Sequence, residues 1–212
     1  RHARRDVRRD TVAVCGAYGR GNAGDEAILQ SILQEIRELD PDVRICVVSR
    51  NPAETRLTHR VQAIHTFHLP AFARLSRRCK LYLNGGGSLI QDVTSRRSLW
   101  FYLYTLWQAR RQKVPVVMYG CGIGPVEHRA DRKLAGRGLS QNVDGLPPRD
   151  TESLQALAEL GVAGPEIIPA ADPSLTMKPH DAALAEGIAR SAGPDPGGEG
   201  VARLPCPWAR VQ

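Results

Sequence analysis

The sequence predicts an α/β fold in which a parallel β-sheet carries helices on both faces. Short apolar runs rich in β-branched residues alternate with amphipathic helical patterns, and glycine-bearing loops follow several of these runs. The 212 residues are 42% hydrophobic and 24% charged, which is typical of a globular protein. Ligands of such sheets bind beyond the carboxyl ends of the strands, so the fold also predicts where a site should lie.

Apolar runs of four to seven residues predict the strands. Five are expected, at 11–16, 43–49, 61–65, 80–85 and 114–120. One more strand, followed by a loop, is expected within 166–175.

Apolar residues at 3.6-residue spacing predict the helices. The clearest spans 25–39, and others are expected at 69–77, 89–112 and 129–138. Thr151 is expected to cap a further helix that runs to Leu160 and stops at Gly161. Two glycines within 134–143 and two prolines within 145–150 interrupt the pattern. We therefore expect a disrupted segment there.

Composition divides the chain into three parts. Residues 1–10 form a basic tail, and 11–180 form the expected Rossmann-like domain. Residues 181–212 are rich in Gly and Pro and predict a linker with the start of a second domain. The chain has no initial Met, so we expect a fragment.

The net charge of +7 comes mostly from arginine, with 25 Arg against 4 Lys. It favours anionic partners or reflects coding bias. Nucleic acid is not expected, since we find no aromatic-interleaved basic stripe and no zinc-finger spacing. The apolar run 98–107 is half the roughly 20 residues of a membrane span and predicts a buried or interfacial helix.

Cysteine and histidine spacing predicts neither a metal site nor a disulfide framework. None of the five cysteines forms a C-x-x-C pair, which is typical of small buried hydrophobes in a reducing compartment. No metal is expected. Histidines 59, 65, 68 and 128 show no partner at nucleophile–base or metal spacing and are expected to be surface or hydrogen-bonded residues.

Four loops follow predicted strands, at 16–29, 84–92, 120–126 and 171–175. The first matches neither G-x-G-x-x-G nor a Walker loop, and no acidic residue ends the second strand. NAD is therefore not expected. The loop instead offers backbone N–H groups at a helix start, which suit an anion.

Polar residues in these loops each allow two readings. Asp25 is a helix N-cap or a ligand for a sugar hydroxyl, and Glu26 adds a first-turn charge. Asp92, expected one turn into the helix after the glycines, is a solvated residue or a site residue. Arg149 pairs with a nearby acid or grips a phosphate or carboxylate.

Taken in order, five segments resemble the polysaccharide pyruvyl transferases over residues 11–178. They are GAYGRGNAGDEAIL, LNGGGSLIQDVTSRRSLWFYLY, VPVVMYGCGIGPV, RDTESLQALAELGV and AADPSL. The combination of G-N-A-G-D-E with G-G-G-S-L-x-Q-D-x-T-S is specific. The branch most similar in these motifs is the bacterial type that pyruvylates secondary cell wall polysaccharide.

The resemblance implies two Rossmann-like domains facing across a cleft, as in GT-B glycosyltransferases, of which this chain would be the N-terminal half. It implies transfer of the enolpyruvyl unit of phosphoenolpyruvate, without a cofactor, to an N-acetylmannosamine of a lipid-linked precursor. The resulting ketal would anchor S-layer homology domains. A cytoplasmic location at the inner face of the membrane, with peripheral membrane contact, would follow. The oligomeric state is not predicted.

The resemblance also suggests site residues. Asp92 as acid/base and Arg149 are the expected catalytic residues. The expected substrate-binding residues are Gly16, Asn22, Asp25, Glu26, Gly85, Gly86, Gly87, Ser88, Gly122, Gly124 and Asp172. Most donor-binding residues would belong to the second domain, so we expect the isolated chain to bind weakly and not to turn over. A GT-B glycosyltransferase using a nucleotide sugar and a non-catalytic anion- or sugar-binding module remain the alternatives.

Overall fold

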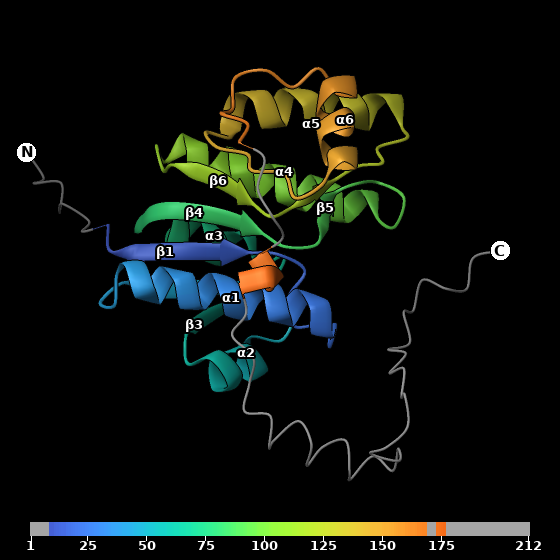
Figure 1. Ribbon diagram of the computed structural model, residues 1–212. Helices are drawn as coiled ribbons and strands as arrows, with labels where there is room; N and C mark the ends of the chain where they lie inside the picture. Colours follow the sequence, from blue (N-terminus) through green and yellow to red (C-terminus); the bar gives the residue numbers. More distant parts are fainter. Residues whose placement is uncertain (1–8, 169–172, 177–212) are drawn as a thin grey trace, which may run out of the picture. The chain divides into compact units, whose positions relative to one another are not determined.

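The computed structural model describes residues 9–168 and 173–176 (Figure 1). By its contacts the chain divides into one unit of residues 1–177 and another of residues 178–212, which lies outside the described residues. Residues 169–172 of the predicted strand region 166–175 also lie outside them. Within the described part, no helix is both long enough and apolar enough to span a bilayer.

The parallel α/β fold is confirmed. A five-stranded sheet has the order β3-β2-β1-β4-β6, and every neighbouring pair is parallel. The strands are β1 (Thr11–Cys15), β2 (Arg44–Ser49), β3 (Gln62–His65), β4 (Cys79–Gly85) and β6 (Val116–Tyr119). All five strand predictions are confirmed to within two residues at each end. Since β1 and β4 are neighbours but not consecutive, the topology reverses between them, which places a crevice at their carboxyl ends.

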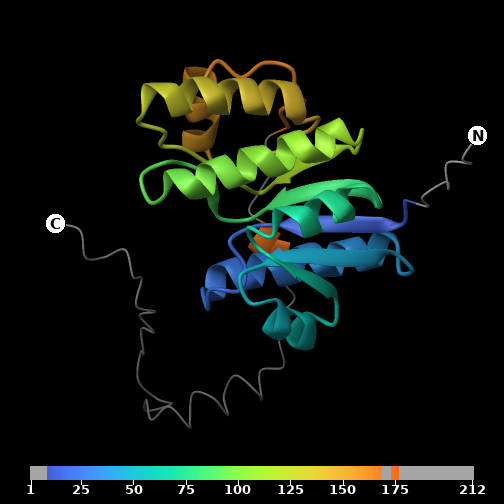
Figure 2. The ribbon, with the colours of Figure 1, turned by 180° about the vertical axis from the view of Figure 1, so that it is seen from behind.

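Two hydrophobic layers cover the two faces of the sheet. Alternate strand residues enter each layer, as Val12 and Val14 do on one side and Ala13 and Cys15 on the other. Helix α1 (Ala23–Leu39) covers the first side with six buried residues. Helices α3 (Leu69–Ser76), α4 (Arg96–Arg111) and α5 (Arg129–Asn142) cover the second side (Figure 2).

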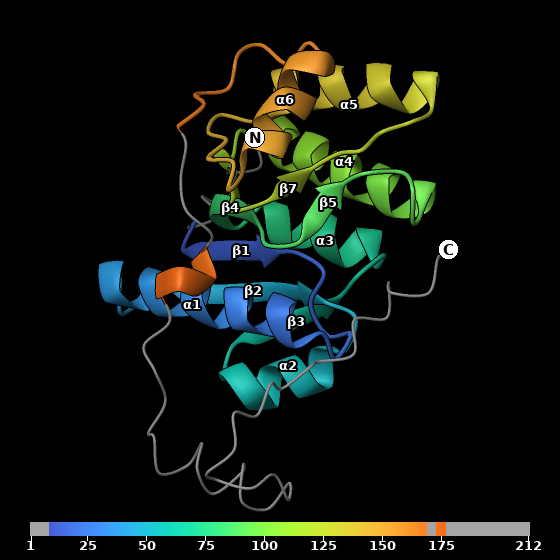
Figure 3. The same cartoon turned by 45° about the vertical axis from the view of Figure 1, so that its right-hand side comes forward.

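Two elements differ from the expected helices. The expected helix 89–112 begins only at Arg96, after the N-cap Ser95, because residues Ser88–Ile90 form a short strand, β5. Strand β5 pairs in parallel with β7 (Gly122–Ile123) and forms a second small sheet (Figure 3). Helix α2 (Pro52–His59), which was not predicted, buries only Thr55 and so has little apolar periodicity.

Helix α5 is not disrupted by its glycines. It continues to Asn142, because both glycines allow close packing. A Cβ atom at Gly136 would lie 2.3 Å from the carbonyl oxygen of Leu160, and one at Gly138 would lie 3.0 Å from Leu103. The expected break was therefore wrong. Helix α6 (Thr151–Glu159) follows, and its N-cap is Asp150 rather than Thr151. A short 3₁₀ turn, η1 (Pro173–Thr176), contacts α1.

Candidate active site

The glycine loops meet at the carboxyl edge of the sheet. Glycines 16 and 85 end neighbouring strands so tightly that a Cβ atom at Gly16 would lie 2.3 Å from the carbonyl oxygen of Gly85. The buried Tyr18 hydroxyl also donates to that oxygen. A Cβ atom at Gly86 would lie 2.6 Å from Ile28 of α1. All three glycines are buried, so they serve close packing beneath the site and present little surface to a substrate.

The strands β5 and β7 join the two remaining glycine loops. The N–H of Gly122 donates to the Gly87 carbonyl at 2.9 Å, and the N–H of Gly124 donates to Ile90 at 2.7 Å. A Cβ atom at Gly122 would lie 2.7 Å from Ser88 Oγ and 3.4 Å from Arg149 Nη2. The structure thus brings together residues that the sequence separates by some sixty positions.

Asp25 faces this junction from the first turn of α1. A Cβ atom at Gly87, whose φ is 69°, would lie 2.9 Å from Asp25 Oδ1. Burial raises the pKa of the Asp25 carboxyl, and the neighbouring Glu26 raises it further. The cations Arg20 and Arg149 act on that pKa in the opposite direction. A carboxyl group with a raised pKa beside two arginines is a suitable proton donor next to an anion.

Arg149 is placed by the start of α6. Its Nε donates to Asp150 Oδ2 at 3.3 Å, so the expected ion pair is present. Asp150 caps α6 by accepting from Ser153 N at 2.7 Å. Ser153 Oγ in turn accepts the N–H of Ile123 in β7 at 3.0 Å. This chain of contacts holds the guanidinium over Gly122, on the same side as Asp25.

The remaining candidates in the first loop are structural. Asn22 is the N-cap of α1 and accepts from Gly24 N at 3.0 Å, so the reading of Asp25 as the cap was wrong. Glu26 accepts from Gly19 N at 2.7 Å and pairs with His59 Nε2 at 3.3 Å. His59 is therefore a hydrogen-bonded histidine, as expected. Asn22 and Glu26 fix the loop that presents Asp25.

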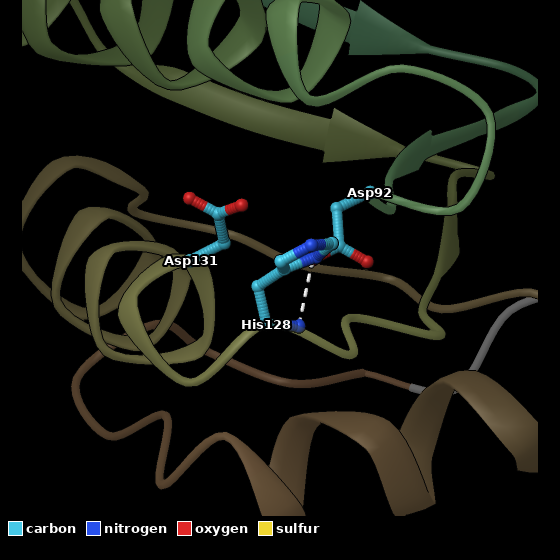
Figure 4. Close-up of side chains that lie close together, drawn as sticks. All are labelled: Asp92, His128 and Asp131. Atoms are coloured by element: carbon cyan, nitrogen blue, oxygen red, sulfur yellow. Dashed lines mark hydrogen bonds and ion pairs between the residues drawn. The ribbon is translucent and has the colours of Figure 1, made fainter.

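Asp92 lies in the loop between β5 and α4, not in a helix, and it is buried. Its Oδ1 accepts from Glu127 N at 2.8 Å. Its Oδ2 accepts from His128 N at 2.9 Å (Figure 4). His128 Nδ1 also contacts Oδ2, at 2.8 Å. Burial alone would raise the pKa of Asp92, but these hydrogen bonds outweigh it and leave the pKa lowered. These contacts make Asp92 a positioning group for the loop before α5, and its lowered pKa does not suit it to donate a proton.

Asp92, His128 and Asp131 together have the composition of a metal site, with one ligand atom from each within 4.8 Å of the others. Both oxygens of Asp131 already accept N–H groups, from Arg96 Nε at 2.6 Å and Trp100 Nε1 at 3.0 Å. A divalent cation would have to displace the Arg96 guanidinium and the hydrogen bonds of Asp92. We assign the cluster to joining α4 and α5 rather than to binding a metal. His128, expected to be a surface or hydrogen-bonded histidine, is both and belongs to this cluster.

Two further candidates stand apart from the junction. Gly124 has φ 85°, and a Cβ atom there would lie 3.1 Å from Ala156 Cβ, so this glycine permits packing of α6. Asp172 lies outside the described residues.

Two further kinds of buried side chain lie outside the predicted site. Asn84 was not predicted as a site residue, and the cysteines were predicted only to be buried. The Asn84 carboxamide, fully buried at the end of β4, has no hydrogen-bond partner for its N or O among the described residues. The four cysteines of the described part are buried and unpaired, as expected. Burial raises the pKa of Cys15 and Cys79 to about 12, which keeps these thiols neutral.

Comparison with known proteins gives one family. A family model described as polysaccharide pyruvyl transferase matches residues 22–209. A search of curated proteins gave no match. Among solved structures, a chain of the "Crystal structure of GtfA/B complex" is 12% identical, with a TM-score of 0.37. The alignment covers 90% of this chain and 30% of that one, so this chain spans less than a third of the solved chain's length.

Proposed function

This chain belongs to the polysaccharide pyruvyl transferase family, and we propose that its glycine-loop junction handles phosphoenolpyruvate during pyruvyl transfer to a sugar. The observation that supports this proposal is the convergence of Asp25, Gly87 and Arg149 at one edge of the sheet. The arrangement offers a proton donor, an exposed backbone and a cation together. Phosphoenolpyruvate carries a phosphate, a carboxylate and a carbon that must be protonated. The proton donor suits that carbon, and the cation and the backbone suit the two anionic groups.

The reaction consumes two sugar hydroxyls and one phosphoenolpyruvate. One hydroxyl oxygen bonds to C2 while C3 accepts a proton and becomes a methyl group. The C2–O bond to phosphate then breaks, and the second hydroxyl oxygen bonds to C2. Of the two hydroxyl protons, one is equivalent to the proton that C3 gains, and the other leaves with inorganic phosphate. The product is a pyruvate ketal.

We assign proton transfer to Asp25. Its raised pKa leaves a larger protonated fraction near neutral pH than an ordinary aspartate has, as protonation of C3 requires. After donating, the carboxylate serves as base for the second hydroxyl. This assignment replaces the expected acid/base role of Asp92.

We assign binding of the donor's anionic groups to Arg149. Its planar fork matches a phosphate or carboxylate in two-point contact, which a lysine cannot reproduce. Arg20 lies near enough to Asp25 to lower the pKa of its carboxyl and adds a second cation. Cations preorganised in this way stabilise negative charge on the departing phosphate.

For the acceptor we propose an N-acetylmannosamine residue of a lipid-linked cell wall precursor, made on the cytoplasmic side of the membrane, whose ketal carboxylate would anchor S-layer proteins. This proposal rests on the motif resemblance to the cell-wall branch. A second, GT-B-like domain carrying further donor-binding residues is part of the same proposal.

Phosphate release tests the function. Phosphoenolpyruvate and an acceptor containing N-acetylmannosamine would be supplied to this chain and to a version extended through the codons that follow residue 212. We expect acceptor-dependent phosphate release from the extended version. Release of a nucleoside diphosphate from a nucleotide sugar, without phosphate release from phosphoenolpyruvate, would support the glycosyltransferase alternative instead.

A further inference from the structure

The outer face of α4 carries a stripe of aromatic and basic side chains. Trp100 is 49% exposed and Trp107 is 45% exposed, and Tyr104 between them is half-buried. The spacing of three and four residues places all three on one side of the helix. The guanidinium of Arg96 lies 5.1 Å from the Trp100 ring, and that of Arg111 lies 5.3 Å from the Trp107 ring. The expectation that the chain lacks an aromatic-interleaved basic stripe is therefore wrong.

Helix α5 continues this surface. It lies beside α4 on the same side of the sheet (Figure 2). Asp131 of α5 accepts the Trp100 N–H, and Gly138 packs against Leu103 of α4. Leu134, which is 48% exposed, falls between these two contact points. We call the set of Trp100, Tyr104, Trp107 and Leu134 the aromatic patch.

Charge is concentrated around this patch. Helix α4 has four arginines and no acidic residue, while α5 has four basic residues and one acidic residue. The two helices therefore carry a net charge of +7, equal to the formal net charge of the whole chain. The rest of the sequence is balanced. Part of this charge is already paired, since Arg96, Arg110 and Arg132 form ion pairs with acidic side chains. Arg111, over the Trp107 ring, places a cation directly at the aromatic patch.

We propose that the aromatic patch and its basic surroundings dock the protein on an anionic lipid bilayer. Tryptophan and tyrosine prefer the boundary between hydrocarbon and water, where arginine pairs with lipid phosphates. The only polar atom of the Trp100 side chain is already bound to Asp131, so the indole surface that remains exposed is carbon. Charge complementarity selects anionic headgroups.

Two other occupants fit less well. A second copy of the same chain would bring two arginine-rich helix pairs together, which opposes symmetric association. A nucleic acid would engage the arginines and stack bases on the indoles, but base stacking does not use the aliphatic side chain of Leu134.

Vesicle co-sedimentation tests this docking on the full chain. Vesicles of phosphatidylcholine would be compared with vesicles containing one third phosphatidylglycerol. We expect binding only to the anionic vesicles and its loss at high salt. The double variant Trp107→Ser/Arg111→Glu should bind at least tenfold more weakly. The matched control Leu57→Ser/Arg60→Glu replaces an exposed apolar residue of α2 and its exposed C-cap arginine, and it should bind like the unchanged chain.

A fluorescence measurement guards against misfolded variants. In a Trp208→Phe background, Trp100 and Trp107 are the only tryptophans. Brominated acyl chains in anionic vesicles should quench their emission. The proposal would be overturned if the vesicles did not quench this emission, or if both double variants bound the vesicles equally well. It would also be overturned if the chain formed a dimer that the Trp107→Ser/Arg111→Glu change dissociates. Tighter, patch-dependent binding to nucleic acid than to anionic vesicles would overturn it as well. Phosphate release is a separate readout, so failure of docking leaves the proposed chemistry untouched.

Discussion

The Asp25 carboxylate lies directly against the backbone of Gly87, where a Cβ atom would come within 2.9 Å of Oδ1. Helix α1 and the loop after β4 thus meet at a single point, and this contact defines the candidate active site.

Gly87→Ala should impair donor binding beyond its effect on folding. The left-handed backbone costs a non-glycine residue about 1–2 kcal/mol, and the new methyl group would also displace Asp25. Gly161→Ala is the matched control, since Gly161 has φ 65° and open space around it. Both variants should lose similar stability in urea denaturation. Only Gly87→Ala should weaken phosphoenolpyruvate binding measured by calorimetry, and equal binding by both would argue against the contact.

Asp25→Asn should stabilise the protein while slowing its reaction. A raised folded pKa means that ionising Asp25 costs stability as pH rises above the unfolded value of 3.8. Asparagine removes that cost, so its gain in melting temperature should be largest at neutral pH and shrink toward pH 4. In the competent extended form, kcat should fall by about 10²–10⁴-fold. Unchanged kcat would remove Asp25 from proton transfer.

Asp92→Asn should lower the stability of the fold, whereas Asp25→Asn should slow the reaction. The buried carboxylate accepts two backbone N–H groups and contacts His128, so its loss should cost about 2–3 kcal/mol. The lowered pKa means that this stability is fully present above 3.8 and is lost as pH falls through the folded pKa. Asp42→Asn, at an exposed site, is the control. Loss of turnover without loss of stability would restore a catalytic role to Asp92.

Asn84→Leu should raise the urea midpoint. An unpaired buried carboxamide costs about 1–3 kcal/mol, and leucine has a similar volume without polar atoms. We expect an unchanged m-value and a higher midpoint. Destabilisation would indicate that the carboxamide is hydrogen-bonded in solution.

Arg149→Ala should weaken phosphoenolpyruvate binding by about 10–100-fold, the range expected when charge-assisted hydrogen bonds are lost. Arg149→Lys should recover only part of the affinity, because the ammonium lacks the fork. Arg74→Ala, at an exposed position of α3, controls for net charge. Equal affinity of all three variants would place the donor elsewhere.

The regular elements were predictable because their signals are local. Alternating burial in β1 and the periodic apolar residues of α1 can both be read along the chain. Strand β5 could not be recognised, because its Ser-Leu-Ile continues smoothly into a helical pattern and its partner, β7, lies more than thirty residues away. Helix α2 has almost no apolar face to recognise.

The same difference between local and long-range signals applies to the site residues. The glycine loops were correctly expected at the carboxyl edge, and the structure places Arg149 beside Gly122 there. The role of Asp92 depends on N–H groups at positions 127 and 128, which no local pattern reveals. Glycines 136 and 138 resemble helix breakers in the sequence. In the structure they allow Leu160 and Leu103 to pack closely against the helix. Tertiary contacts decided these positions.

The most direct test of the proposed function follows the transferred carbon. Phosphoenolpyruvate labelled with ¹³C at C2 would be incubated with the acceptor and the extended protein, and the label would be followed by NMR. We predict a ketal carbon that appears in step with inorganic phosphate and is lost in Asp25→Asn and Arg149→Ala. Ketal formation at an undiminished rate in both variants, or none in any form, would contradict the assignment of this site.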